Sequence, residues 1–174
     1  MPNLQIKLMY NQAMSMMSDT DMLDQKSVTL SDASYLIKLL VFEILIKCVV
    51  LINTSKYKQN HNYQELFGSL SENIRKRIMI QAAQWSGKCI ENDDLQKLLV
   101  IYKSNFVKIR YPFESYKNMT EREYCDHSDL WIELGSPIDE ADFQYFPDQL
   151  RGLIKALSEQ VEEYLVETGV NKIH

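Results

Sequence analysis

The sequence predicts an all-α protein, an up-and-down bundle of about five major helices with short accessory helices. The longest apolar run, residues 31–52, contains no Pro or Gly and is too long for a strand. Only five Gly and four Pro occur in 174 residues, which leaves few turns for an all-β fold. Later segments repeat apolar residues every three or four positions, as amphipathic helices do. A chain of this length is expected to form one domain, residues 1–174.

The first expected helix runs from Pro2 to about Met17. Pro2 suits the first helical turn, where its missing N–H is not needed. Its methionines are better explained by core filling than by an adaptable binding surface. The apolar residues at helical spacing are Leu4, Leu8, Met9, Ala13, Met16 and Met17. A polar connector is expected to begin at Ser18.

The run at residues 31–52 is expected to form the central helix. Thr29 with Asp32 offers a capping box, and Ser31 is an alternative N-cap. Because apolar residues occupy nearly every side of this helix, protein should surround it.

Three charges argue against a membrane span for the central helix. Lys38, Glu43 and Lys47 lie within it, and each would be costly in hydrocarbon. Glu43 and Lys47 are four residues apart in the favourable order, so they can neutralise each other on one face. A buried helix is the expectation.

Cap residues divide the middle of the chain. Asn62 with Glu65 begins a short helical turn that ends near Gly68. Ser71 is expected to cap a longer helix that stops at Gly87.

The next helix is expected to be capped by Asn92 or Asp93 and to end before Pro112, which disfavours helical geometry at Tyr111. Its apolar face consists of Leu95, Leu98, Leu99, Tyr102, Phe106 and Ile109.

In the last third of the chain, helix is predicted weakly in the first part and strongly near the end. Thr120 with Glu123 predicts a short helix over Glu121–Asp129, and Ser136 followed by Pro137 resembles a cap and a first helical residue. A long helix is expected from about Asp148 to Thr168, with Gly169 after its end. Its inward residues are Leu150, Leu153, Ile154, Leu157, Val161, Tyr164 and Leu165.

Charge is distributed unevenly along the chain. Residues 54–117 hold eleven Lys or Arg against six Asp or Glu, whereas residues 118–174 hold four against thirteen. The basic middle could meet phosphates, and the simpler interpretation is solvated helix faces or partners for the acidic third.

Three cysteines, Cys48, Cys89 and Cys125, are widely separated, which favours reduced thiols and argues against a zinc site. The N-terminus lacks the pattern of a signal peptide, so a cytoplasmic location is expected. No phosphate-cradling Gly loop, H-E-x-x-H or G-x-S-x-G occurs, and no cofactor is expected.

Three segments resemble the HEPN superfamily of small helical bundles, found in bacterial defence and toxin–antitoxin systems. They are FEILIKC (Phe42–Cys48), HNYQELFGSL (His61–Leu70) and FVKIRYPFESY (Phe106–Tyr116). The resemblance implies a HEPN-like core at about residues 31–116, followed by an acidic helical part at 118–174. It also implies metal-independent RNA cleavage in a cleft that a homodimer commonly forms.

In that family an Arg and a His a few positions later bind phosphate and move protons, which suits guanidinium and imidazole chemistry. Arg110 lies in the resembling block, but Ser115, Tyr116 and Lys117 occupy the positions where the His is expected. The alternative match is Arg122 with His127. An exposed pair in an acidic setting is the competing interpretation of these two residues.

Glu43 completes the candidate site residues. A carboxylate on a mostly buried helix needs a partner, which Lys47, Arg110 or a Tyr hydroxyl could supply. We expect it to belong first to a structural network and second to a site wall. His61 is expected to be a capping or loop residue rather than a catalyst.

Two hypotheses follow from the sequence. In the first, the chain is a HEPN-like RNA-binding protein and, if an enzyme, a metal-independent endoribonuclease. In the second, it is a non-catalytic helical module that dimerises or holds a protein partner such as an antitoxin. A basic cleft distinguishes the first, and an exposed apolar patch the second.

Overall fold

A computed structural model of the chain describes residues 2–26, 31–88 and 91–169. Within these ranges the fold is all-α, as predicted, with eight α-helices, one 3₁₀ turn and no strand. In this described part, no helix is long and apolar enough to cross a bilayer. The elements are α1 (Pro2–Lys26), α2 (Asp32–Thr54), α3 (Tyr63–Gly68), α4 (Glu72–Ser86), α5 (Asn92–Lys108), α6 (Phe113–Tyr116), α7 (Glu121–Glu133), η1 (Ile138–Glu140) and α8 (Pro147–Glu167).

Helix α1 is longer than the sequence suggested. It continues through the expected connector, because that segment holds no Pro or Gly and packs along α2. Thr20 is buried there and donates to the Met17 carbonyl at 2.7 Å, while Asp24 pairs with Lys38 of α2. Of the expected apolar face of α1, Ala13 is buried and the methionines Met9, Met16 and Met17 pack against the core, whereas Leu4 and Leu8 are more than half exposed. Ile6 and Tyr10 are buried instead.

Helix α2 is the buried centre of the fold. Its N-cap is Ser31, whose side chain accepts from the Ser34 N–H at 3.4 Å, whereas the Thr29 alternative falls outside the described residues. Thirteen of its residues are buried, which agrees with apolar side chains on all its sides.

The remaining caps follow the sequence closely, with two differences. Glu91, rather than Asn92 or Asp93, is the N-cap of α5, because its carbonyl already accepts from the Leu95 N–H at 2.9 Å. Ser136 does not start a helix, because its φ of 55° is left-handed. Its N–H instead donates a hydrogen bond to the Trp131 carbonyl at 2.9 Å, at the C-terminal end of α7. The Thr120 capping box is present, and α7 extends one turn beyond the expected Asp129.

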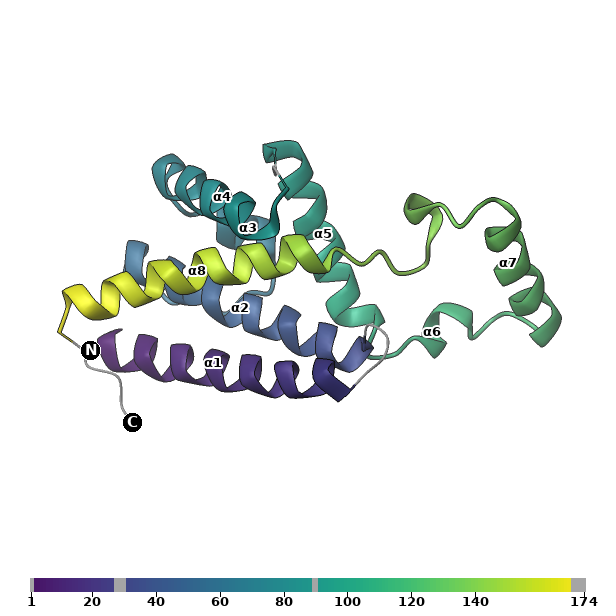
Figure 1. Cartoon of the computed structure of the whole chain (residues 1–174), viewed down its shortest axis with the longest axis horizontal. Helices are drawn as coiled ribbons and strands as arrows, with labels where there is room; N and C mark the ends of the chain where they lie inside the picture. Colours follow the sequence, from purple (N-terminus) through teal and green to yellow (C-terminus); the bar gives the residue numbers. More distant parts are fainter. Residues whose placement is uncertain (1, 27–30, 89–90, 170–174) are drawn as a thin grey trace.

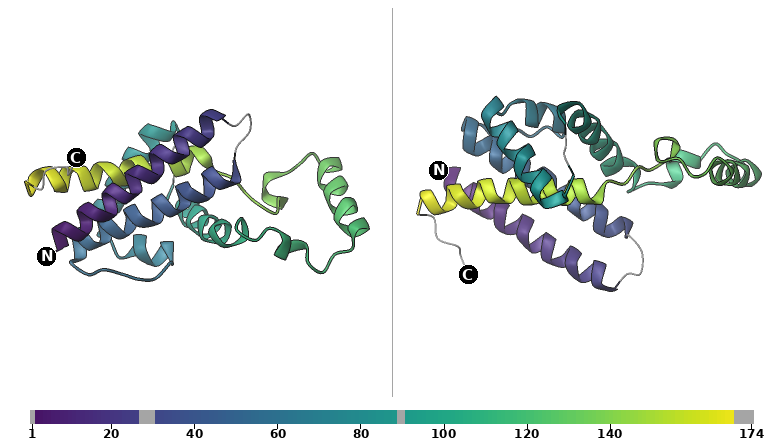
Figure 2. Two further views of the ribbon diagram at one scale, coloured as in Figure 1. Left: turned by 90° about the horizontal axis from the view of Figure 1, so that it is seen from below. Right: turned by 45° about the horizontal axis from the view of Figure 1, so that its top comes forward.

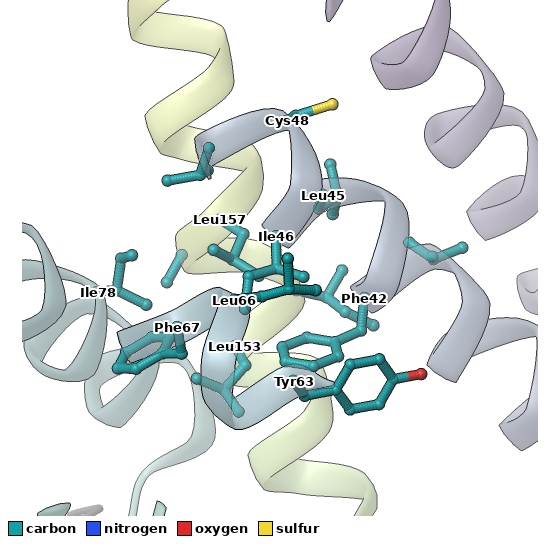
Figure 3. Packing of buried hydrophobic residues seen from close by; sticks show 14 of the residues in the cluster. Phe42, Leu45, Ile46, Cys48, Tyr63, Leu66, Phe67, Ile78, Leu153 and Leu157 are labelled. Atoms are coloured by element: carbon teal, nitrogen blue, oxygen red, sulfur yellow. The ribbon is translucent and has the colours of Figure 1, made fainter. Parts of the chain in front are cut away.

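Helices α1, α2, α4 and α8 form the body of the bundle. Helix α8 lies between α2 and α4, and α1 packs on the other side of α2 (Figures 1 and 2). The short α3 and the following α5 pack against α2 as well. Figure 3 shows that side chains of α2, α3, α4 and α8 meet in one cluster, with Phe42, Ile46, Leu66 and Leu157 among them.

Residues 111–146 form a protruding arm that contains α6, α7 and η1. The chain leaves the bundle at the end of α5, runs outward and returns at the start of α8 (Figures 1 and 2). The arm is attached at its base, where the Asn105 side chain donates to the Gln144 carbonyl and the Tyr145 hydroxyl to Asp32, both at 2.7 Å. No residue of α6 or α7 is buried.

Candidate functional site at the Glu43 carboxylate

The central helix carries two buried charges. Because Glu43 and Lys47 are four residues apart, one turn of α2 places them on the same face. Their side chains are only 6% and 7% exposed, and the Lys47 ammonium lies 2.8 Å from Glu43 Oε1. The pairing expected from their spacing is therefore present.

The loop after α2 brings a histidine to the same carboxylate. Ser55 adopts a left-handed φ of 55° and ends α2, and Asn62 begins α3 by accepting from the Glu65 N–H. Between them the chain turns back, so that His61 Nδ1 lies 2.8 Å from Glu43 Oε1. The His61 side chain is 68% exposed, although its partner is buried.

This contact favours one tautomer of the His61 ring. An ionised carboxylate only accepts hydrogen bonds, so Nδ1 is the donor. In the neutral ring Nε2 is then unprotonated, and it can accept a proton from a molecule that reaches the exposed ring. A buried carboxylate that orients an exposed imidazole is the arrangement of a general base.

Tyr63 adds a third donor to Glu43. Its hydroxyl lies 3.2 Å from Oε2, and its buried ring meets Phe42 edge to face at a centroid distance of 5.3 Å. Burial, and then the Glu43 charge and hydrogen bond, raise the pKa of the Tyr63 hydroxyl far above its usual value. Tyr63 therefore remains a neutral donor at physiological pH.

Arg110 lies near this cluster, just after the end of α5. Its positive charge opposes the larger effects of burial and Glu43, which raise the Tyr63 pKa. Its Nε donates to the Phe106 carbonyl at 2.8 Å, and its guanidinium lies 4.7 Å from the centre of the Phe106 ring. Among the described residues no carboxylate pairs with Arg110, and this includes Glu114 four positions later. An exposed, unpaired guanidinium can bind phosphate.

The other two candidates lie on the arm, away from Glu43 (Figure 1). Arg122 is 91% exposed and lies 3.8 Å from Asp126, whereas His127 Nε2 lies 3.4 Å from Asp142. Five helical positions separate two side chains by about 140° around the axis, so Arg122 and His127 face different directions. The structure does not bring this pair together.

His127 instead lines a pocket inside the arm. The pocket has a volume of about 320 Å³ and a mainly apolar lining. Asp142 accepts there from the Tyr116 hydroxyl at 2.7 Å, and burial, followed by this hydrogen bond, raises the Tyr116 pKa. No Lys or Arg lines this pocket and the Asp142 carboxylate does, which suits an anionic ligand poorly.

Sequence reasoning missed His61 as a partner of Glu43, whereas it expected a Tyr hydroxyl there without identifying it as that of Tyr63. One signal was available, because a carboxylate on a buried helix requires donors and HNYQELF follows that helix after the loop of residues 55–60. Among the described residues, no group of three His, Cys, Asp or Glu side chains is arranged to hold a metal ion.

Comparisons with known proteins give no relative. No family model matches the chain, and no curated protein and no solved structure matches it significantly. The class of protein defined by the structure is thus an all-α bundle with a polar site on its central helix.

Proposed function

We propose that this chain is a HEPN-like RNA-binding protein that cleaves RNA without a metal ion, in the cytoplasm, within a bacterial defence or toxin–antitoxin system. The observation that carries the proposal is the contact of the exposed His61 ring with the buried Glu43 carboxylate. Arg110 is exposed and forms no ion pair with a described carboxylate. Two of the three segments that resemble the HEPN superfamily supply Glu43 and His61, and the third supplies Arg110.

In the proposed reaction, His61 Nε2 accepts the proton of a ribose 2′-hydroxyl. The 2′-oxygen forms a bond to the adjacent phosphorus, and the bond from phosphorus to the 5′-oxygen breaks. Water protonates the leaving 5′-oxygen, and His61 later returns its proton to solvent. The products are a 2′,3′-cyclic phosphate and a 5′-hydroxyl.

Each neighbouring group has a part in this reaction. Glu43 stabilises the imidazolium that forms on His61, while Lys47 and Tyr63 hold the Glu43 carboxylate in position. Arg110 binds the phosphate and stabilises the charge that develops on it. Lys56 and Lys58, in the loop before His61, add positive charge that attracts the RNA backbone.

The test is cleavage of a mixed pool of single-stranded and structured RNA by the full chain in EDTA. We expect cyclic phosphate and 5′-hydroxyl ends, and a loss of about 100-fold or more in rate for Arg110→Ala. Arg151 is a matched control, since it is an exposed arginine on α8 that pairs with Asp148. Equal rates for Arg110→Ala and Arg151→Ala would contradict the assignment of Arg110.

A second candidate function, a non-catalytic interaction module, is favoured by the arm, where α7 has no buried residue. Its partner would be a protein such as an antitoxin or a second copy of the chain. An intact protein that neither cleaves nor retains RNA at low salt would support this function over the first.

A further inference from the structure

The pocket inside the arm is lined mainly by aromatic rings. Tyr116 comes from α6, Trp131 from α7, and Phe143 and Tyr145 from the segment that returns to α8 (Figure 1). All four side chains are partly buried. The pocket volume of about 320 Å³ lies near the lower end of the range of about 300–1,000 Å³ that is typical of small-molecule sites. The pocket therefore suits a small organic ligand.

Hydrogen bonds within the protein occupy the N–H and O–H donors of three of these rings. The pairs are Trp131 Nε1 with the Pro137 carbonyl at 3.1 Å, the Tyr116 hydroxyl with Asp142 at 2.7 Å, and the Tyr145 hydroxyl with Asp32 at 2.7 Å. What the rings offer to a ligand is then mainly their carbon surface. The face of an aromatic ring carries partial negative charge, which attracts cations.

Asp142 places a carboxylate beside these rings. Its Oδ2 accepts from the Tyr116 hydroxyl and lies 3.4 Å from Nε2 of His127. No described residue donates to Oδ1, and no described Lys or Arg pairs with this carboxylate. The side chain is 39% exposed, so a ligand can reach it from solvent. An ionised Asp142 thus has one oxygen left to accept a hydrogen bond from a ligand.

The charges around the pocket also favour a cation. Residues 111–146 hold nine Asp or Glu and only two basic residues, Lys117 and Arg122. Neither of these two lines the pocket, and Arg122 lies 3.8 Å from Asp126. His127 does line it, but its neutral ring already supplies the Nε2–H that the Asp142 carboxylate can accept. Such a field attracts an organic cation and repels a phosphate, which argues against a nucleotide.

The single available oxygen of Asp142 indicates which kind of cation fits. A primary ammonium has three N–H donors, so two of them would lack a protein acceptor among the rings. A quaternary ammonium has no donor and would leave the Asp142 oxygen without a hydrogen bond. A dimethylated ammonium has one N–H for Asp142 and two methyl groups for the ring surfaces.

We propose that the arm pocket binds a methylated organic ammonium, whose N–H donates to Asp142 Oδ1 and whose methyl groups contact the aromatic rings. A free methylated amine and a methylated lysine side chain share this chemistry. The inference does not depend on RNA cleavage, because Glu43, His61 and Arg110 all lie outside the lining of this pocket.

The test is a calorimetric titration of the full chain at neutral pH with ethanolamine, N,N-dimethylethanolamine and choline. The neutral alcohol 3,3-dimethylbutanol is the matched control, since it has the shape of choline without the charge. We expect N,N-dimethylethanolamine to bind most tightly and the neutral alcohol about tenfold or more weakly. A peptide carrying dimethyllysine, compared with the unmodified peptide, distinguishes a protein source from a free amine.

Two substitutions locate the binding. Asp142→Asn should weaken N,N-dimethylethanolamine about tenfold and leave the affinity for the neutral alcohol unchanged. Asp139→Asn is the matched control, because it removes the same charge from the same arm outside the pocket lining, and it should leave both affinities unchanged. The fluorescence of Trp131, measured in a Trp85→Phe background, should change on binding and reports whether the arm of each variant is folded.

Three results would overturn the proposal. They are no saturable binding of either the dimethylated amine or the dimethyllysine peptide up to about 10 mM, equal affinities for choline and the neutral alcohol, and equal affinities of wild type and a folded Asp142→Asn for the dimethylated amine. Because the first two are measured on the wild type, they decide the matter even if Asp142→Asn fails to fold. Binding of the dimethyllysine peptide alone would support the ammonium site and assign its source to a protein side chain.

Discussion

His61 Nδ1 lies 2.8 Å from Oε1 of Glu43, so an exposed imidazole is held by a carboxylate that is itself buried on the central helix. The two residues are 18 positions apart in the chain, with the end of the helix and a loop between them. The same oxygen also accepts from Lys47, and the other oxygen accepts from Tyr63. Because Glu43 has three donors, its effects on stability and on chemistry can be separated by changing the donors one at a time.

Glu43→Ala should lower the free energy of unfolding by about 3–5 kcal/mol, because it leaves the buried Lys47 ammonium without its partner. Urea unfolding measures this loss. Glu72 and Lys76 provide a matched control, since they have the same spacing and an ammonium–carboxylate distance of 2.6 Å but are exposed. Glu72→Ala should leave stability nearly unchanged.

Replacing both buried charges is informative as well. Glu43→Leu with Lys47→Leu should recover part of the loss caused by Glu43→Ala, because no unpaired ammonium remains. A double variant less stable than Glu43→Ala would show that the charges themselves stabilise the fold.

Tyr63 should make stability fall at alkaline pH. Its pKa is raised in the folded state by burial and then by Glu43, so above pH of about 10 the unfolded chain loses the phenolic proton while the folded chain keeps it. The contribution of the protonated Tyr63 hydroxyl to the free energy of unfolding is complete below pH of about 10. It is lost as the pH rises toward the folded-state pKa of Tyr63. Urea unfolding at pH 8 and 10.5 should therefore show a larger decrease for wild type than for Tyr63→Phe. Equal decreases would contradict this.

Gly152 should tolerate no side chain. A Cβ at this position of α8 would lie 2.5 Å from the Ala82 carbonyl oxygen of α4, and backbone cannot yield as a flexible side chain can. Gly152→Ala should cost about 1–3 kcal/mol, measured by thermal unfolding. Gly68→Ala is the control, since a Cβ there meets nothing within 4 Å. If both variants melted at the same temperature, the close contact of α4 and α8 would be wrong.

Local signals in the sequence predict much of this fold. Ser31, Asn62 and Thr120 cap the helices for which they were expected, because a cap depends on residues within one turn. The pairing of Glu43 with Lys47 follows from helix geometry alone.

Tertiary relationships could not be predicted in this way. The contact of His61 with Glu43 depends on how the loop after α2 turns back, which composition does not determine. The capping-box pair of Thr120 and Glu123 predicts a helix at residues 121–129, but not that α7 stands apart from the core. The apolar face of a helix does not show in the sequence which surface will cover it. The sequence match of Arg122 with His127 considered only their spacing and not the angle between them around the helix axis.

The most direct measurement is the rate of RNA cleavage in EDTA by wild type, His61→Ala and His127→Ala, with folding checked for each. We predict that His61→Ala loses at least about 100-fold in rate, as expected for loss of a general base, and that His127→Ala loses far less. A folded His61→Ala variant that cleaves at the wild-type rate, or a loss confined to His127→Ala, would contradict a site at Glu43 and His61.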